Sequence, residues 1–269
     1  MESHPELFSD GARLSIRKKI HSAYSRINYD IYDLTRQLLD LRPSEDVLDV
    51  GSGLGEFLLG LRLKGHFGKL IGIDRSADVI DKARRESFKR SQWVEFRVGD
   101  AEDLNFPSNG FDCVTALHVL GHASPEKALM EIGRVLRADG RVVLSTNSRM
   151  CFPLLEKLKQ EARERFGWFL ATEWVEGFDS ESAGEMIRRY FGNVEETRYD
   201  DVLQYPDAEV LVDLFRSSRG IWSDRMNEAE WERIVDWARD RALELIPEHG
   251  YAEDPKSFSL FRCTAPLGL

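Results

Sequence analysis

The most constraining feature of the sequence is a glycine-rich turn that directly follows a short apolar run. Val47–Val50 reads as a buried strand, and Gly51-Ser-Gly-Leu-Gly55 separates it from a helix-forming stretch that begins at Glu56. Glycines lack a Cβ atom and adopt positive φ at little cost, so a ligand can approach the backbone closely at the start of the helix. The turn therefore predicts a nucleotide-type ligand at the carboxyl end of a strand.

The residues from Val47 to Asn147 alternate between short strand-like runs and amphipathic helical stretches. The expected strands lie at residues 47–50, 70–73, 93–98, 111–116 and 141–146. The expected helices lie at residues 56–64, 76–89 and 125–136. Because strand–helix–strand units form right-handed crossovers, the alternation predicts an α/β fold with a doubly wound, mostly parallel sheet.

The sequence on both sides of this alternation is mainly helical. Helical patterns extend over residues 14–41, 152–166, 180–190 and 206–246. Strand-like runs are expected at residues 194–199 and 257–263. The final strands are expected to complete the sheet.

The spacing of the glycines separates two kinds of ligand. A dinucleotide fingerprint reads G-x-G-x-x-G, and its third glycine packs the helix against the strand. Here the third glycine arrives one position early, at Gly55, and Glu56 stands where the fingerprint has glycine or alanine. This spacing, with Asp49 two residues before Gly51, weighs against a nicotinamide cofactor.

The composition narrows the possible functions. The formal net charge is −10, and a diffuse acidic surface disfavours a nucleic acid substrate. No apolar run approaches the roughly 20 residues of a membrane-spanning helix, and the N-terminus lacks the features of a secretory signal. Cys113, Cys151 and Cys263 have no CxxC spacing, which predicts reduced thiols rather than disulfides or a zinc site. Together these features predict a cytoplasmic protein.

Four motifs in order resemble those of class I S-adenosylmethionine-dependent methyltransferases, in the type 11 group that includes quinone-biosynthesis enzymes. Ile71-Gly-Ile-Asp74-Arg75 follows the glycine turn, and Val98-Gly-Asp100-Ala101-Glu102 resembles an adenine-binding motif. Asn105 to Asp112 then leads into the fourth strand. The resemblance implies a Rossmann-like seven-stranded sheet, mostly parallel with the last strand antiparallel, and helical lid insertions.

The resemblance also implies how the chain is divided. Residues 1–41 would form an N-terminal helical lid and residues 42–150 the core that binds S-adenosylmethionine. Residues 151–205 would be a helical insertion that returns to the core, and residues 206–256 a helical substrate lid. Residues 257–269 would supply the final core strand.

By similarity, Asp74 would accept hydrogen bonds from both ribose hydroxyls, and the Asp100 side chain would bind the exocyclic amine of adenine. The Ala101 N–H would reach the adenine ring, and Leu117 would lie near the methionine portion. The residues expected to bind S-adenosylmethionine, or its product S-adenosylhomocysteine, are Tyr24, Asp49, Gly51, Ser52, Gly53, Gly55, Asp74, Arg75, Asp100, Ala101, Glu102 and Leu117.

Methyl transfer from a sulfonium is an in-line displacement, so the protein needs a general base only if the acceptor must lose a proton. His118 and His122 follow the fourth strand at a spacing of i, i+4, which would place them on one face of a helical turn. They are the catalytic candidates, with structural or substrate-packing roles as the alternative. Similar quinone O-methyltransferases have metal-binding glutamates where this chain has His118 and Gly121, so no metal is predicted.

Several residues outside the motifs have two possible roles. Tyr24 and Tyr29 lie in the lead-in, which folds over the cofactor in similar enzymes, and buried packing is the alternative. A basic run in the same segment would bind an acidic acceptor or form a solvated helix face. The tryptophans of the insertions would line an aromatic acceptor pocket or anchor the lid helices. The basic run is Arg17, Lys18 and Lys19, and the tryptophans are Trp168, Trp174, Trp222, Trp231 and Trp237.

The sequence therefore predicts methyl transfer from S-adenosylmethionine to an O, N or C atom of a small molecule. After the fourth strand there is neither the Asn/Asp-Pro-Pro-Tyr/Phe motif of adenine-N6 and glutamine methyltransferases nor the nucleophilic cysteine of 5-cytosine enzymes. A methyltransferase acting on RNA or protein, and a binding protein without turnover, remain as alternatives. The expected partner is the small-molecule acceptor, without nucleic acid or membrane, for a monomer or homodimer.

Overall fold

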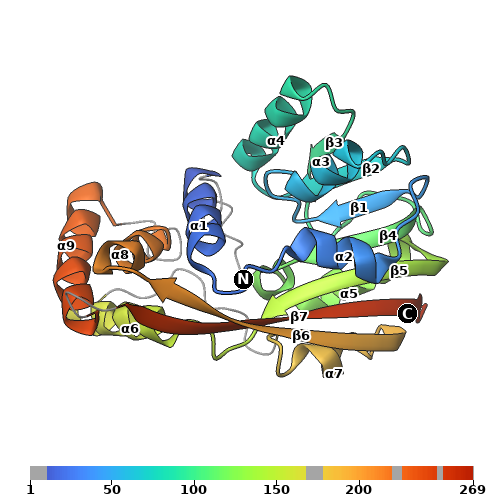
Figure 1. The fold of residues 1–269 in the computed structure, drawn as a ribbon. Helices are drawn as coiled ribbons and strands as arrows, with labels where there is room; N and C mark the ends of the chain where they lie inside the picture. Colours follow the sequence, from blue (N-terminus) through green and yellow to red (C-terminus); the bar gives the residue numbers. More distant parts are fainter. Residues whose placement is uncertain (1–10, 168–177, 220–225, 247–250, 269) are drawn as a thin grey trace. The chain divides into compact units, whose positions relative to one another are not determined.

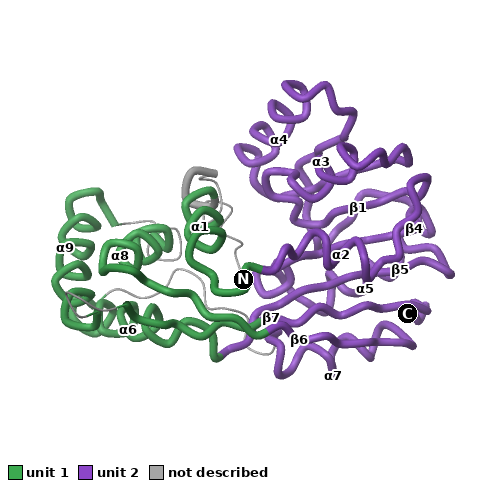
Figure 2. Tube along the Cα trace, in the orientation of Figure 1, with its two compact units in different colours: residues 1–28, 150–173, 200–257 green, residues 29–149, 174–199, 258–269 purple. Residues whose placement is uncertain are grey.

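The computed structural model describes residues 11–167, 178–219, 226–246 and 251–268 (Figure 1). The chain forms two compact units (Figure 2). Unit 1 comprises Met1–Asn28, Met150–Glu173 and Asp200–Ser257. Unit 2 comprises Tyr29–Arg149, Trp174–Tyr199 and Phe258–Leu269. Among the described residues, no helix is both long and apolar enough to cross a membrane.

A seven-stranded sheet with the order β3-β2-β1-β4-β5-β7-β6 organises unit 2. The pairs β1–β2, β2–β3, β1–β4 and β4–β5 are parallel, whereas β7 runs antiparallel to β5. This topology confirms the predicted fold. The strands are β1 (Val47–Val50), β2 (Leu70–Asp74), β3 (Glu95–Val98), β4 (Phe111–Leu117), β5 (Leu136–Asn147), β6 (Phe191–Tyr205) and β7 (Ala252–Pro266).

Two apolar cores cover the two faces of this sheet. Side chains alternate along a strand, so Leu48 contributes to the core under α5 and α7, while Val47 contributes to the core under α2, α3 and α4. Burial on both faces explains why the central strands are apolar runs. The helices are α2 (Ile31–Leu39), α3 (Glu56–Leu63), α4 (Ala77–Lys89), α5 (Pro125–Val135) and α7 (Ala183–Ile187), with a short 3-10 helix η2 (Leu120–His122).

Unit 1 is mainly helical and has its own apolar core. Helices α6, α8 and α9 pack against one another, and α1 packs against α8. Trp231 on α9 is buried and stacks on Phe215 of α8, with ring centroids 5.6 Å apart. Trp237 packs against the same core, so both tryptophans anchor helices of this unit. The helices are α1 (Gly11–Tyr24), α6 (Pro153–Phe166), α8 (Ala208–Arg216) and α9 (Glu228–Leu245).

The compact units divide the chain differently from the predicted segments. The lead-in consists of two helices, and α1 belongs to unit 1 while α2 belongs to unit 2. Helix α2 packs on β5 and buries Leu39 in the core of unit 2, which explains its assignment. Strands β6 and β7 are longer than predicted and contribute residues to both units. The predicted roles of the helical segments as lids stay predictions.

Other element boundaries also differ from the sequence prediction. The third strand begins at Glu95 rather than at Trp93, whose side chain is 90% exposed. The helix expected at residues 180–190 is confined to α7. Trp168, Trp174 and Trp222 lie outside the described residues.

Candidate cofactor site

The glycine-rich turn joins β1 to α3 at the carboxyl end of β1. Gly51, Gly53 and Gly55 have φ angles of 68°, 54° and 77°. A Cβ atom at Gly51 would lie 2.1 Å from Val119 Cγ2, and one at Gly55 would lie 2.3 Å from the ring of Phe96. Positions 51 and 55 therefore require glycine, both for the backbone conformation and for the close packing around the turn.

Ser52 lies within this turn, where sequence reasoning placed a cofactor contact. Its N–H donates a hydrogen bond to the Ile73 carbonyl at 2.8 Å, which fixes the turn on β2. Its Oγ is buried and has no hydrogen-bond partner among the described residues. An unsatisfied buried hydroxyl is costly, so a polar ligand bound at the turn would compensate for it.

Asp74 ends β2 beside the turn. Its Oδ2 accepts a hydrogen bond from the Gly53 N–H at 3.1 Å, and its Oδ1 accepts one from the Ser76 N–H at 3.0 Å. Burial raises the pKa of this carboxyl group, although the hydrogen bonds oppose the shift. A carboxylate has about four acceptor sites, so Asp74 retains capacity for a diol such as a ribose.

Asp49 lies inside β1 and is only 3% exposed. Its Oδ1 accepts a hydrogen bond from Thr115 Oγ1 on β4 at 2.7 Å. Its backbone is in register with Gly72 of β2 and Thr115 of β4. Asp49 therefore fastens the base of the turn to its neighbours, and its predicted contact with the cofactor stays a prediction.

Arg75 joins the predicted adenine-binding motif to the loop after β4. Its Nη2 lies 3.7 Å from Asp100 Oδ2, and its Nη1 donates a hydrogen bond to the His122 carbonyl at 3.4 Å. Asp100 Oδ1 accepts a hydrogen bond from the Glu102 N–H at 3.0 Å, which shapes the turn around Ala101. These contacts bring Arg75, Asp100 and Ala101 to neighbouring loops of unit 2.

Glu102 has a structural partner that sequence reasoning missed. Its Oε1 accepts a hydrogen bond from the N–H of Ser124 at 2.8 Å, and its Oε2 lies 3.3 Å from Lys127 Nζ. Ser124 is the N-cap residue of α5, so Glu102 holds the start of that helix. The predicted contact between Glu102 and the cofactor stays a prediction.

His118 directly follows Leu117, the last residue of β4, and adopts a φ of 55°. Its N–H donates to Ser145 Oγ at 2.9 Å and to the Ser145 carbonyl at 3.2 Å. A positive φ is uncommon for a residue with a side chain and often marks a functional position. Ser145 on β5 is fully buried and thus holds this conformation.

The prediction that one helical turn carries both histidines is wrong. His118 has a left-handed backbone, and only Leu120–His122 forms a short 3-10 helix. The two side chains therefore do not occupy i and i+4 of one α-helix. The left-handed backbone of His118 interrupts helical geometry directly after β4, and the next residue, Val119, packs against Gly51.

Aromatic rings from distant chain segments gather next to His118. Phe258 on β7 lies 6.0 Å from the His118 ring and stacks on Tyr199 of β6, with centroids 5.1 Å apart. Tyr29 meets Tyr199 edge-on at 5.1 Å. Sequence reasoning considered Tyr29 and missed the other two, because only the strand pairing brings them here. All three rings are half-buried and provide an apolar surface.

Tyr32 and Glu56 form a second pair that sequence reasoning missed. The Tyr32 hydroxyl on α2 donates to Glu56 Oε2 at 2.9 Å. Glu56 is the first residue of α3 and follows Gly55, the N-cap residue. The position of Glu56 directly after the glycine turn was the only sequence signal for this residue.

The remaining candidates lie in unit 1. Tyr24 packs against the apolar core of that unit, and its predicted contact with the cofactor stays a prediction. Arg17 donates hydrogen bonds to Ser217 Oγ at 3.0 Å and to the Ser217 carbonyl at 2.9 Å. These bonds join α1 to Ser217, the C-cap residue of α8. Among the described residues, no group of three or more His, Cys, Asp and Glu side chains could hold a metal ion.

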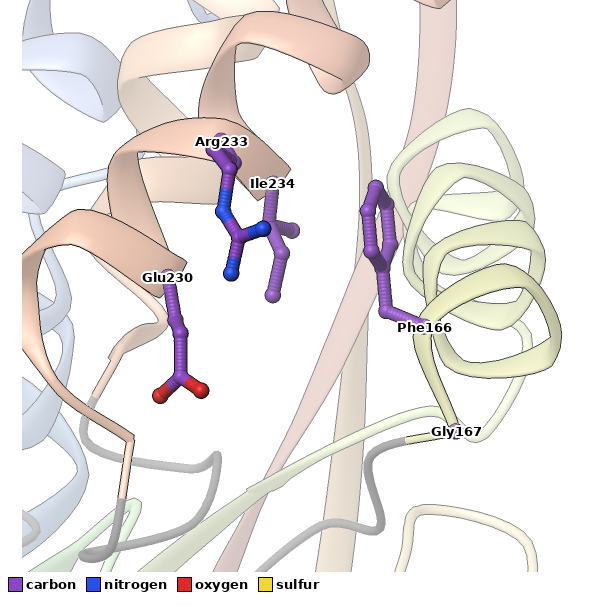
Figure 3. Close-up of a pocket in the computed structure, with 5 residues that line it drawn as sticks. All are labelled: Phe166, Gly167, Glu230, Arg233 and Ile234. Carbon is purple, nitrogen blue, oxygen red and sulfur yellow. The ribbon is translucent and has the colours of Figure 1, made fainter.

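A cavity of about 340 Å³ lies in unit 1, where Phe166 and Gly167 at the end of α6 face three residues of α9 (Figure 3). A second cavity, of about 270 Å³, lies in unit 2 beside α5 and Tyr190. The predicted cofactor and catalytic residues are not among the residues that line these two cavities. The residues of α9 at the first cavity are Glu230, Arg233 and Ile234.

Comparison with known proteins agrees with this geometry. Residues 48–144 match the family described as "Methyltransferase domain" (Methyltransf_11). The chain is 33% identical over 122 residues to the uncharacterized methyltransferase YcgJ of Bacillus subtilis, covering 44% of this chain and 47% of the relative. The solved structure of YcgJ has a TM-score of 0.60 at 20% identity, covering 87% of this chain and 97% of that chain.

Two further proteins are similar to this chain, one in sequence and one in fold. The chain is 32% identical over 121 residues to the ubiquinone/menaquinone biosynthesis C-methyltransferase UbiE of Hahella chejuensis, covering 44% of this chain and 49% of the relative. A phosphoethanolamine N-methyltransferase 2 of Haemonchus contortus, solved with S-adenosyl-L-methionine, has a TM-score of 0.60 at 16% identity, covering 96% of this chain and 58% of that chain.

This chain spans about half the length of the YcgJ and UbiE relatives. The Asp74 carboxylate, the buried Ser52 hydroxyl and the glycine backbone fit the ribose and the charged methionine portion of S-adenosylmethionine. The family match, the topology and these residues agree with one another. The match over residues 48–144 shows a methyltransferase domain in this part of the chain, and the likeness to the YcgJ structure shows that the two proteins share a fold.

Proposed function

We propose that this chain transfers the methyl group of S-adenosylmethionine to an O, N or C atom of a small-molecule acceptor. The observation that carries the proposal is the position of His118. This residue follows β4, which lies beside β1 in the sheet, and the neighbouring Val119 contacts Gly51 of the glycine turn. An imidazole at this edge is suited to take a proton from the acceptor near neutral pH.

When bound, the cofactor supplies a methyl group activated by a positively charged sulfur. Asp74 would bind the ribose hydroxyls, Asp100 would bind the adenine amine, and Leu117 would contact the methionine portion. His118 would accept the proton that the attacking oxygen or nitrogen loses, with His122 as the alternative base. These contacts would hold the acceptor in line with the carbon–sulfur bond that breaks.

The aromatic cluster of Tyr29, Tyr199 and Phe258 supports an acceptor with an apolar or aromatic part, because it offers half-buried rings beside His118. The relative named for quinone biosynthesis supports a small-molecule acceptor as well. The three cysteines are buried and form no disulfide among the described residues, which suits a reducing compartment such as the cytoplasm.

The test uses purified protein with methyl-labelled S-adenosylmethionine and a panel of phenols, quinols and amines, with RNA and protein as further acceptors. We expect label in the small molecules. His118→Asn should lower kcat at least tenfold and leave the Kd for S-adenosylhomocysteine within twofold, because asparagine tolerates a positive φ.

His122→Asn serves as the matched variant. A loss of kcat in that variant alone would transfer the role of the base to His122. Label found only in RNA or protein would contradict the small-molecule acceptor. Cofactor binding without any transfer would instead favour a binding protein.

A further inference from the structure

The first observation concerns the hydrogen bond between Tyr32 and Glu56 at the glycine turn. The phenol donates to Glu56 Oε2 at 2.9 Å, and its ring packs 6.0 Å from the ring of Phe57. Burial raises the pKa of Tyr32, and the charge of Asp49 raises it further. The phenol therefore remains a donor at neutral pH, and it fixes the orientation of the Glu56 carboxylate.

The second observation is the direction that the sheet imposes on the cofactor. The strands run in the order β3-β2-β1-β4, with Asp100 just after β3, Asp74 at the end of β2 and Leu117 at the end of β4. A ligand whose adenine lies at β3 and whose ribose lies at β2 must place its methionine portion across β1 and β4. Glu56 directly follows the turn that leaves β1, at the end of the site where this portion is expected.

The third observation is the charge at this end of the site. The methionine portion of S-adenosylmethionine carries an ammonium and a sulfonium against one carboxylate. Asp74 is assigned to the ribose, and Asp49 is buried within β1 with Thr115 on its Oδ1. Glu56 is only half-buried, and it is the acidic residue that directly follows the turn.

We propose that Glu56 forms an ion pair with the α-ammonium of the cofactor's methionine portion, and that Tyr32 is a positioning residue that holds the Glu56 carboxylate. A purely structural alternative is that the pair only joins α2 to α3. The two roles differ in one respect: only the ion pair depends on the amino group of the ligand.

The experiment measures binding by calorimetry with two ligands. One is S-adenosylhomocysteine, and the other is its desamino analogue, 5′-(3-carboxypropylthio)-5′-deoxyadenosine, which keeps the carboxylate and lacks the ammonium. Glu56→Gln keeps an oxygen for the Tyr32 hydroxyl and removes only the charge. It should raise the Kd for S-adenosylhomocysteine about tenfold and leave the Kd for the analogue within about twofold.

Tyr32→Phe should weaken S-adenosylhomocysteine binding less, by about threefold, and should add nothing in the Glu56→Gln background. Glu86→Gln on α4, where the half-buried Glu86 pairs with Lys89, is the matched control and should change neither Kd. The proposal is overturned if Glu56→Gln weakens both ligands by the same factor, or if it leaves S-adenosylhomocysteine binding unchanged. The test needs no acceptor, so its failure is distinguishable from failure of the proposed transfer reaction.

Discussion

Replacing Gly51 with alanine tests the reasoning about the glycine turn most directly, because the structure gives two separate costs. Its φ of 68° is a left-handed conformation that costs a residue with a Cβ about 1–2 kcal/mol. The new Cβ would also lie 2.1 Å from Val119 Cγ2, and overpacking of this kind costs about 1–3 kcal/mol. We expect Gly51→Ala to lower the free energy of unfolding by about 2–5 kcal/mol.

Gly60→Ala is the matched control, because it is the same chemical change at a position inside α3. Apart from the adjacent residues and the backbone of α3 itself, no atom of the described residues lies within 4 Å of the position that a Cβ would take at Gly60. Alanine is the better helix former, so this variant should be more stable by about 0.5–1 kcal/mol. Two identical substitutions are therefore expected to have opposite signs.

The assay is chemical denaturation followed by circular dichroism, with calorimetric titration of S-adenosylhomocysteine on each folded variant. Gly51→Ala combined with Val119→Ala should recover the steric part of the loss. This double variant should remain about 1–2 kcal/mol less stable than the wild type, because position 51 keeps its left-handed backbone conformation. If Gly51→Ala and Gly60→Ala changed stability equally, the assignment of the turn as a steric and conformational constraint would be refuted.

The remaining predictions concern two carboxylates of the site, Asp74 and Glu102. Asp74→Ala should raise the Kd for S-adenosylhomocysteine about 10- to 100-fold by removing a charge-assisted acceptor, and an unchanged calorimetric Kd would contradict the ribose assignment. In the wild type, this affinity should fall as the pH is lowered, beginning above the usual range of aspartate, because burial raises the pKa of Asp74 and only the carboxylate accepts both hydroxyls. The stability of the ligand-free protein should change in the opposite direction. Because folding raises the pKa of Asp74, the contribution of this group to stability falls as the pH rises through that range. Glu102→Gln should lower the unfolding free energy by about 1 kcal/mol through the weakened start of α5 and leave the Kd nearly unchanged; a large change in Kd alone would support cofactor contact instead.

The parts of the site that depend on local sequence could be predicted. Gly51 and Gly55 sit in a turn whose geometry is encoded by the glycines themselves, and Asp74 ends a short apolar run of the kind that buried strands have. The alternation of strands and helices also predicted the parallel part of the sheet. Right-handed crossovers leave few ways to connect such units.

Features that depend on distant contacts could not be predicted. The left-handed backbone of His118 is held by Ser145 of β5, 27 residues further along the chain, and nothing in its own sequence favours that conformation. Tyr199 lies in the part of β6 at residues 192–200, where most residues are exposed, so the apolar pattern understated the length of β6. Glu102 resembled a ligand contact by its position in a motif, yet its hydrogen bond to Ser124 arises only from the fold.

The antiparallel pairing of β5 with β7 has a consequence for synthesis of the chain on the ribosome. Asn147 ends β5, but its partner Phe258 is translated only about 110 residues later. At roughly 5–20 residues per second, the edge of β5 stays without this partner for about 5–20 s. An unpaired strand edge is a template for aggregation, so this interval is the period in which the nascent chain most needs protection by a chaperone.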